Sequence, residues 1–179
     1  MIQMPKRELS LTRLISPERI LSRLPGNARH QVTRALVGAA ACDLGLEAKT
    51  ILTTLAHQPG QPTFGPARGV AMLHVGVDVP RRPAAFLARL KEPIAFGAAD
   101  GEFVQIVTLV LAPTDEPSTL LRAMACVARR LRSRSVREAI RTAHDAVAIF
   151  SILVEERWPA AASDFHDKED RRAKLCRLS

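Results

Sequence analysis

The run FVQIVTLVL, residues 103–111, constrains the fold of this chain more than any other feature. It is dense in β-branched and other apolar residues, a composition typical of buried strands. A second run of the same kind, GVAMLHVGVDV at residues 69–79, predicts another strand. The fold must therefore contain a buried β-sheet, and the neighbouring segments must supply the elements that cover it.

Two helices are expected before these strands. Asn27 can cap the first, which runs to about Leu44 and stops at Gly45, and the second covers residues 46–57. Residues 58–68 contain three prolines and two glycines, so we expect a loop there.

Other segments complete the pattern. Residues 16–26 predict a short strand or helical turn that ends at a Pro-Gly pair, and residues 83–90 and 94–96 predict two extended pieces. Helical spacing returns after Pro117 or Ser118 and again over residues 136–154, with a break near Thr142. This order of elements predicts an α/β fold: a single-domain sandwich with a mixed β-sheet flanked by helices.

The length of 179 residues suits one domain with a proper core. We expect that domain over residues 1–157 and a polar C-terminal tail over residues 158–179. No apolar run reaches the roughly 20 residues of a membrane helix, and the N-terminus lacks the apolar segment of a secretory signal. We therefore expect a cytoplasmic protein without membrane insertion.

The cysteines and charges point to no classical site. Three widely spaced cysteines fit neither a disulfide framework nor a zinc site, so no metal is expected. The formal net charge of +8 favours acidic partners or nucleic acid, and arginines gather between residues 129 and 141. A solvated helix face explains that run more simply, because the sequence has no nucleic-acid-binding motif and no tyrosine.

His74 is the residue that asks for an explanation, because it interrupts an apolar strand. By alternation it shares one face with Val70, Met72 and Gly76, whereas the opposite face is uniformly apolar and must be core. We expect Gly76 to leave open space beside the imidazole. Two explanations remain at this point: a structural histidine with a satisfied hydrogen bond, or a ring that performs chemistry at an exposed strand end.

A family resemblance bears on this choice. The blocks ISPERIL, GVAMLHVGVDV, KEPIAF, GEFVQIVTLVLAP and LLRAMACVARRL, in this order, resemble an enzyme IIA domain of the bacterial phosphotransferase system. The branch is the fructose/mannitol and nitrogen-regulatory one, and the resemblance covers roughly residues 10–155. Its signature G-[VI]-A-[IL]-P-H ends in a histidine that accepts a phosphoryl group from a small phosphocarrier protein, which implies that His74 is the acceptor here.

The chemistry that this resemblance implies needs neither a metal nor another cofactor. A neutral imidazole nitrogen attacks phosphorus in line, and catalysis consists mostly of positioning and electrostatics. An ordinary histidine is largely neutral at cytoplasmic pH, so no strong base is required. The phosphoryl oxygens do require hydrogen-bond donors or positive charge.

The sequence departs from the family where those donors are expected. Gln58 replaces an arginine, Thr63 and Phe64 replace a Ser-Thr pair, and Leu120 replaces a second histidine. The proline before the acceptor is Leu73. Three residues are candidates for stabilising the phosphoryl group in spite of these changes: Thr63, Arg68 and His57. The simpler explanations are a solvated loop charge for Arg68 and a cation at a helix C-terminus for His57.

Two functional hypotheses follow. In the first, the chain is a diverged nitrogen-regulatory-type enzyme IIA protein that is phosphorylated on His74 by a phosphocarrier and regulates partner proteins. In the second, it is a non-catalytic interaction module that keeps the enzyme IIA fold but has lost phosphotransfer. Binding of nucleic acid is a third, weaker hypothesis that rests on charge alone.

Overall fold

The computed structural model describes residues 9–57, 69–78, 82–96 and 102–155. Their helices and strands follow one another in a simple order along the chain. This order is α1 (Leu11–Leu14), the 3-10 turn η1 (Pro17–Arg19), β1 (Ile20–Leu24), α2 (Arg29–Leu44), α3 (Ala48–His57), β2 (Val70–Val77), β3 (Ala84–Ala95), β4 (Phe103–Pro113), α4 (Pro117–Leu131), α5 (Arg134–Thr142) and α6 (Ala146–Val154). None of the described helices is long and apolar enough to cross a membrane.

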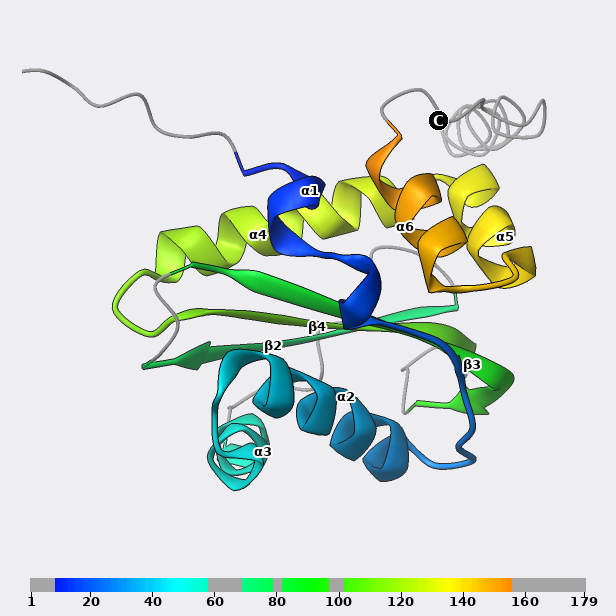
Figure 1. Cartoon of the computed structure of the whole chain (residues 1–179). Helices are drawn as coiled ribbons and strands as arrows, with labels where there is room; N and C mark the ends of the chain where they lie inside the picture. Colours follow the sequence, from blue (N-terminus) through cyan, green and yellow to red (C-terminus); the bar gives the residue numbers. More distant parts are fainter. Residues whose placement is uncertain (1–8, 58–68, 79–81, 97–101, 156–179) are drawn as a thin grey trace, which may run out of the picture.

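The described strands form one mixed sheet in the order β1-β3-β4-β2 (Figure 1). β3 and β4 are antiparallel, whereas β1 pairs in parallel with β3 and β2 in parallel with β4. The predicted strand at residues 103–111 is central in this sheet, and the strand that carries His74 lies at its edge. The mixed sheet expected from the sequence is confirmed.

Helices cover both faces of the sheet, as Figure 1 shows. One face packs against α2 and α3 around a core that includes Leu36, Ile51 and Phe86. The other packs against α1, α4, α5 and α6 around a second core that includes Ile106, Val110 and Ile140. The α/β sandwich is therefore confirmed, with an apolar core on each side of the sheet.

β3 is a single strand, although its sequence predicts two pieces. Lys91, Glu92 and Pro93 are exposed and lie within the strand, where the pairing with β4 shifts register between Arg89 and Ile94. An irregularity of this kind accommodates a proline, which cannot donate to the ladder, without ending the strand.

The start of α2 also corrects an expectation. The residue at the N-cap position is Ala28, not Asn27, and it makes no side-chain capping bond. Instead, the Asn27 backbone N–H donates to Gln31 Oε1 at 3.3 Å. A side chain from the first turn of α2 thus binds the backbone of the residue before the N-cap. The predicted stop at Gly45 is confirmed, with the left-handed φ of 65° that favours glycine.

Arginines bind the carbonyl groups at several helix ends in the layer that contains α4, α5 and α6. Arg89, from β3, is buried and donates to the carbonyls of Ser22, Ile140, Arg141 and Ala143. Arg137 donates to the carbonyls of Leu131 and Arg132 at the end of α4, and Arg130 donates to that of Ile152 in α6. These cations satisfy carbonyls that a helix C-terminus leaves unpaired.

Candidate functional site

His74 lies near the carboxyl end of β2, in register with Val110 of β4. The alternation predicted from the sequence is confirmed: Ala71, Leu73, Val75 and Val77 belong to the core beside α2 and α3. His74 therefore faces the other side, which α4 covers. Val70 and Met72, which precede it on this face, belong to the core beside α4. His74 follows them along the strand, toward the end of that core.

The imidazole of His74 is half-buried. Burial lowers its pKa below the ordinary value of 6.5, because the partly apolar surroundings disfavour the charged form. The ring is therefore neutral at neutral pH, and a ring nitrogen keeps the lone pair that a nucleophile requires.

Three other elements, β4, α3 and α4, lie around the end of β2. β2 and β4 run in parallel and finish at the same end of the sheet, where Figure 1 also shows α3 and the beginning of α4. The connection from β4 to α4 is short, since β4 ends at Pro113 and α4 begins at Pro117. Ligands of open α/β sheets commonly bind outside the carboxyl ends of the strands, and His74 is close to such an end.

Gly76 has Thr114 as a neighbour, which bounds the space that we expected beside the imidazole. A Cβ atom at Gly76 would lie 3.4 Å from both Cα and Oγ1 of Thr114, which is ordinary van der Waals contact. The turn after β4 thus brings a hydroxyl group over Gly76, two residues along the strand from His74. Sequence analysis missed Thr114, because the contact joins residues 38 positions apart. The only available signal was its place directly after the LAP end of a predicted strand.

The side chain at the position of the family's second histidine cannot form a hydrogen bond. Leu120 lies in the first turn of α4 and packs, half-buried, against the apolar core on the His74 side. Leu73, which replaces the proline, is buried in the opposite core. Both side chains therefore serve packing.

His57 is the last residue of α3 and is exposed. Its Nδ1 donates to the Thr53 carbonyl of the same helix at 2.7 Å, so the ring satisfies a carbonyl near the helix C-terminus. Its role in stabilising a phosphoryl group stays a prediction. The other two candidates, Thr63 and Arg68, lie outside the described residues together with Gln58 and Phe64.

A cavity of about 410 Å³ adjoins this end of the sheet. Gly76, Asp78 and Thr114 line one side of it, and α3 contributes Thr50 and Thr54. The volume lies within the range typical of small-ligand sites.

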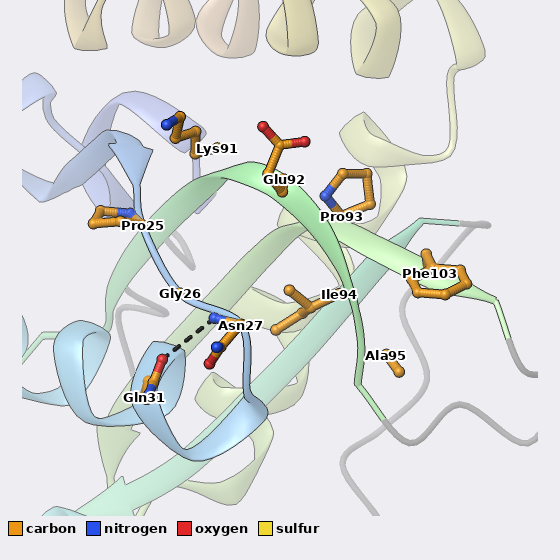
Figure 2. A pocket seen from close by; sticks show the side chains of 10 residues that line it. All are labelled: Pro25, Gly26, Asn27, Gln31, Lys91, Glu92, Pro93, Ile94, Ala95 and Phe103. Atoms are coloured by element: carbon orange, nitrogen blue, oxygen red, sulfur yellow. Dashed lines mark hydrogen bonds between the residues drawn. The ribbon is translucent and has the colours of Figure 1, made fainter.

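A larger cavity of about 760 Å³ lies elsewhere, between the start of α2 and the end of β3. Figure 2 shows its lining, with Asn27 and Gln31 on one side and Pro93, Ile94 and Phe103 on the other. Phe103 begins β4, and Val110, the partner of His74, follows seven residues later, or about 23 Å along the strand. This cavity is therefore separate from the His74 site.

The arginine run is not a continuous solvated face. Arg130 and Arg137 are half-buried and bind helix carbonyls, and Arg141 forms an ion pair with Glu138 at 2.7 Å. These contacts give the three arginines structural roles. Their charge is therefore weak support for binding of nucleic acid. Within the described ranges, no group of three His, Cys, Asp or Glu side chains could hold a metal ion.

Comparisons with known proteins agree with this geometry. A family described as "Phosphoenolpyruvate-dependent sugar phosphotransferase system, EIIA 2" matches residues 44–156. A nitrogen regulatory protein of Bradyrhizobium diazoefficiens is 32% identical over 145 residues, which are 81% of this chain and 95% of the relative. One from Pseudomonas aeruginosa is 28% identical, over 82% of this chain and 96% of the relative.

Solved structures match the same fold. Nitrogen regulatory protein IIA-Ntr from Neisseria meningitidis superposes with a TM-score of 0.69 at 20% identity, covering 77% of this chain and 94% of that one. IIA mannitol from Escherichia coli superposes with a TM-score of 0.60 at 15% identity, covering 78% and 98%.

Proposed function

Because this chain belongs to the EIIA 2 family of the phosphoenolpyruvate-dependent sugar phosphotransferase system, we propose that it accepts a phosphoryl group on His74 from a phosphocarrier protein. We further propose that its phosphorylation state regulates partner proteins. We expect the protein to act in the cytoplasm, together with this phosphocarrier.

The placement of His74 is the observation that carries the phosphoacceptor proposal. The ring lies in the second half of an edge strand, three residues before its carboxyl end, half-buried and with a pKa lowered by burial. Partial burial restricts the ring, and the neutral form is the one whose nitrogen lone pair can attack phosphorus in line.

The nitrogen-regulatory branch is preferred to sugar transport because the curated relatives bear that name and match over most of their length. A regulatory protein of this kind acts by presenting two surfaces, one with and one without a phosphoryl group. The added charge at the carboxyl end of β2 would change which proteins dock there.

Transfer is expected to be slow. The side chain of Leu120 cannot donate a hydrogen bond, and loss of one well-placed donor typically costs about 10²–10³ in rate. Losses within one site are not additive, but a site that lacks several donors should be much slower than one that retains them.

A labelling experiment tests the proposal. The full chain is mixed with phosphoenolpyruvate, the general phosphotransferase enzyme and its phosphocarrier, and intact mass is followed at mildly alkaline pH. A phosphoryl adduct should form on the wild type and on the His144→Ala control, whose side chain is 83% exposed in the connection between α5 and α6. It should be absent from His74→Ala. An adduct that persists in His74→Ala would show that another residue is the acceptor.

Restoring the missing groups gives a second arm. The double variant Gln58→Arg, Leu120→His should be labelled faster than the wild type, because it returns a cation and a ring donor to the positions that the family uses. A wild type that is already fast would mean that residues of this chain, such as Arg68 or His57, have taken over those roles.

The second candidate function is a non-catalytic interaction module. It is favoured by the packing of Leu120 against the core on the His74 side, which puts an apolar side chain where the family has a histidine. It becomes the better account if neither the wild type nor the restored variant is labelled.

A further inference from the structure

We propose that Thr114 is a catalytic residue, whose hydroxyl donates a hydrogen bond to the phosphoryl group during its transfer to His74. This inference rests on the proposed function and adds a residue that no family position suggested. It identifies a donor that compensates in part for the apolar Leu120.

The contact between Thr114 and Gly76 places the hydroxyl on the correct face of the sheet. All three atoms nearest to a Cβ built on Gly76 belong to Thr114, with Oγ1 at 3.4 Å. Such a Cβ would point to the same face as His74, because the two residues are two positions apart in one strand. The Thr114 hydroxyl therefore lies over the His74 face.

The spacing suits a group attached to the imidazole. Gly76 lies two positions, or about 6.6 Å, along the strand from His74, and Thr114 Oγ1 lies 3.4 Å from a Cβ built on Gly76. An imidazole that carries a phosphoryl group extends over a comparable length. A phosphoryl group on His74 that is directed along the strand toward Gly76 would therefore approach the Thr114 hydroxyl.

The backbone of Thr114 is fixed while its side chain stays available. Its N–H donates to the Val77 carbonyl at 3.1 Å, which ties the turn to the end of β2. The side chain is exposed, and its hydroxyl makes no hydrogen bond within the part of the chain that the structure describes. A donor held in this way needs little reorganisation when charge arrives.

Two neighbouring threonine hydroxyls on this side of the sheet are already engaged. Thr108 is buried and donates to the Ala71 carbonyl at 3.4 Å, and Thr119 donates to Glu116 Oε2 at 2.7 Å. Thr114 also lies three residues before α4, whose N-terminal partial charge favours the same anion. The geometry therefore favours Thr114 over these two threonines.

The proposed step is a simple displacement. The lone pair of the neutral His74 nitrogen forms the N–P bond, while the bond from phosphorus to the leaving atom of the phosphocarrier breaks and its electron pair stays with the carrier. The other His74 nitrogen keeps its proton. Thr114 transfers no proton; its O–H donates to a phosphoryl oxygen, where negative charge is held throughout.

Two substitutions at Thr114 test the role of the hydroxyl. Thr114→Val keeps the shape and removes the donor, and Thr114→Ser keeps the donor. We expect labelling by the phosphocarrier to be about 10-fold slower in Thr114→Val. This is less than the 10²–10³-fold loss of rate that follows removal of an enclosed oxyanion donor, because Thr114 is exposed. Thr114→Ser should stay within about threefold of the wild type. The control is Thr142→Val, because Thr142 is at the end of α5 and its hydroxyl donates to carbonyls of its own helix.

The rate must be measured against phosphocarrier concentration. A donor to the phosphoryl group lowers the transfer rate at saturating carrier, whereas a docking contact raises the half-saturating concentration. Equal rates in the wild type and Thr114→Val overturn this inference and leave the proposed function intact. A serine variant as slow as the valine variant also overturns it. A wild type that is not labelled overturns the proposed function itself.

Discussion

At the scale of single residues, His74 shows how one environment gives a side chain two properties. Its strand position buries the ring against an apolar core, and the same burial keeps the ring neutral. A fully exposed imidazole would spend more time protonated, and protonation would remove the lone pair that the proposed phosphoryl transfer requires. Position and protonation state thus have one physical cause.

The pKa of His74 can be checked directly. We expect an NMR titration of its ring protons to give a midpoint below 6.5 in the folded protein and a midpoint near 6.5 in urea, because desolvation disfavours the charged form. The unfolded state then binds more protons between these two values, so the free energy of unfolding should decrease as pH falls below 6.5. His74→Gln should lack that part of the pH dependence. A folded midpoint above 6.5 would contradict the assigned burial.

Arg89 is the residue on which we expect packing to depend most strongly. Its guanidinium binds carbonyls of β1, of α5 and of the residue after α5. Replacement by methionine should lower the free energy of unfolding by about 3 kcal/mol, because it removes charge-assisted hydrogen bonds and leaves buried acceptors unpaired. Urea unfolding measures this change. Arg34→Met, at an exposed position on α2, should stay within about 0.5 kcal/mol of the wild type, and equal effects would argue against the role assigned to Arg89.

At the scale of elements, sequence patterns predicted those parts that depend on local chemistry. The alternation in β2 identified which residues face each core, and Gly45 marked the end of α2. The break between α5 and α6 near Thr142 was also expected and is confirmed. Each of these features follows from a short stretch of chain.

Features that depend on distant partners could not be predicted in this way. β3 continues through Lys91 and Pro93 because β4 pairs with it on both sides of the irregularity. Thr114 reaches Gly76 only because β2 and β4 are neighbours in the sheet. The sequence around β3 and around Thr114 does not indicate these distant partners.

The start of α6 offers a test of local helix chemistry. Asp145 Oδ1 accepts a hydrogen bond from the Ala148 N–H at 2.8 Å, so Asp145 is a side-chain N-cap. Asp145→Ala should lower the free energy of unfolding by about 1 kcal/mol, and Asp145→Asn should lower it by much less, since asparagine caps as well as aspartate. Chemical denaturation distinguishes the two. An asparagine variant as unstable as the alanine variant would show that charge, and not capping, is what matters there.

At the scale of the whole molecule, the sheet stabilises two cores at once. The last core residue in the described part of the chain is Leu153, in α6. We therefore expect deletion of residues 158–179 to leave the midpoint of thermal unfolding within about 2–4 °C, a shift that corresponds to about 1 kcal/mol for a domain of this size. Differential scanning calorimetry on the two lengths measures the shift. A much larger decrease would mean that the tail contributes to a core.

The strand order also carries a consequence for the sequence of events in folding. Ala95 of β3 pairs with Phe103 of β4, eight residues later, whereas Leu73 of β2 pairs with Leu109 and Ile20 of β1 with Leu87, which are 36 and 67 residues apart. Closing the shorter loop costs less entropy, so we expect the β3–β4 hairpin to form in the transition state and β2 to join it afterwards.

Stopped-flow kinetics can test this order. Val107→Ala in β4 should mainly slow folding, and Val75→Ala in β2 should mainly speed unfolding. The reverse pattern would contradict it. If the order holds, His74 reaches its place in the sheet late in folding. Phosphorylation of this histidine would then occur on molecules whose sheet is complete, and partly folded molecules would not be phosphorylated by the phosphocarrier.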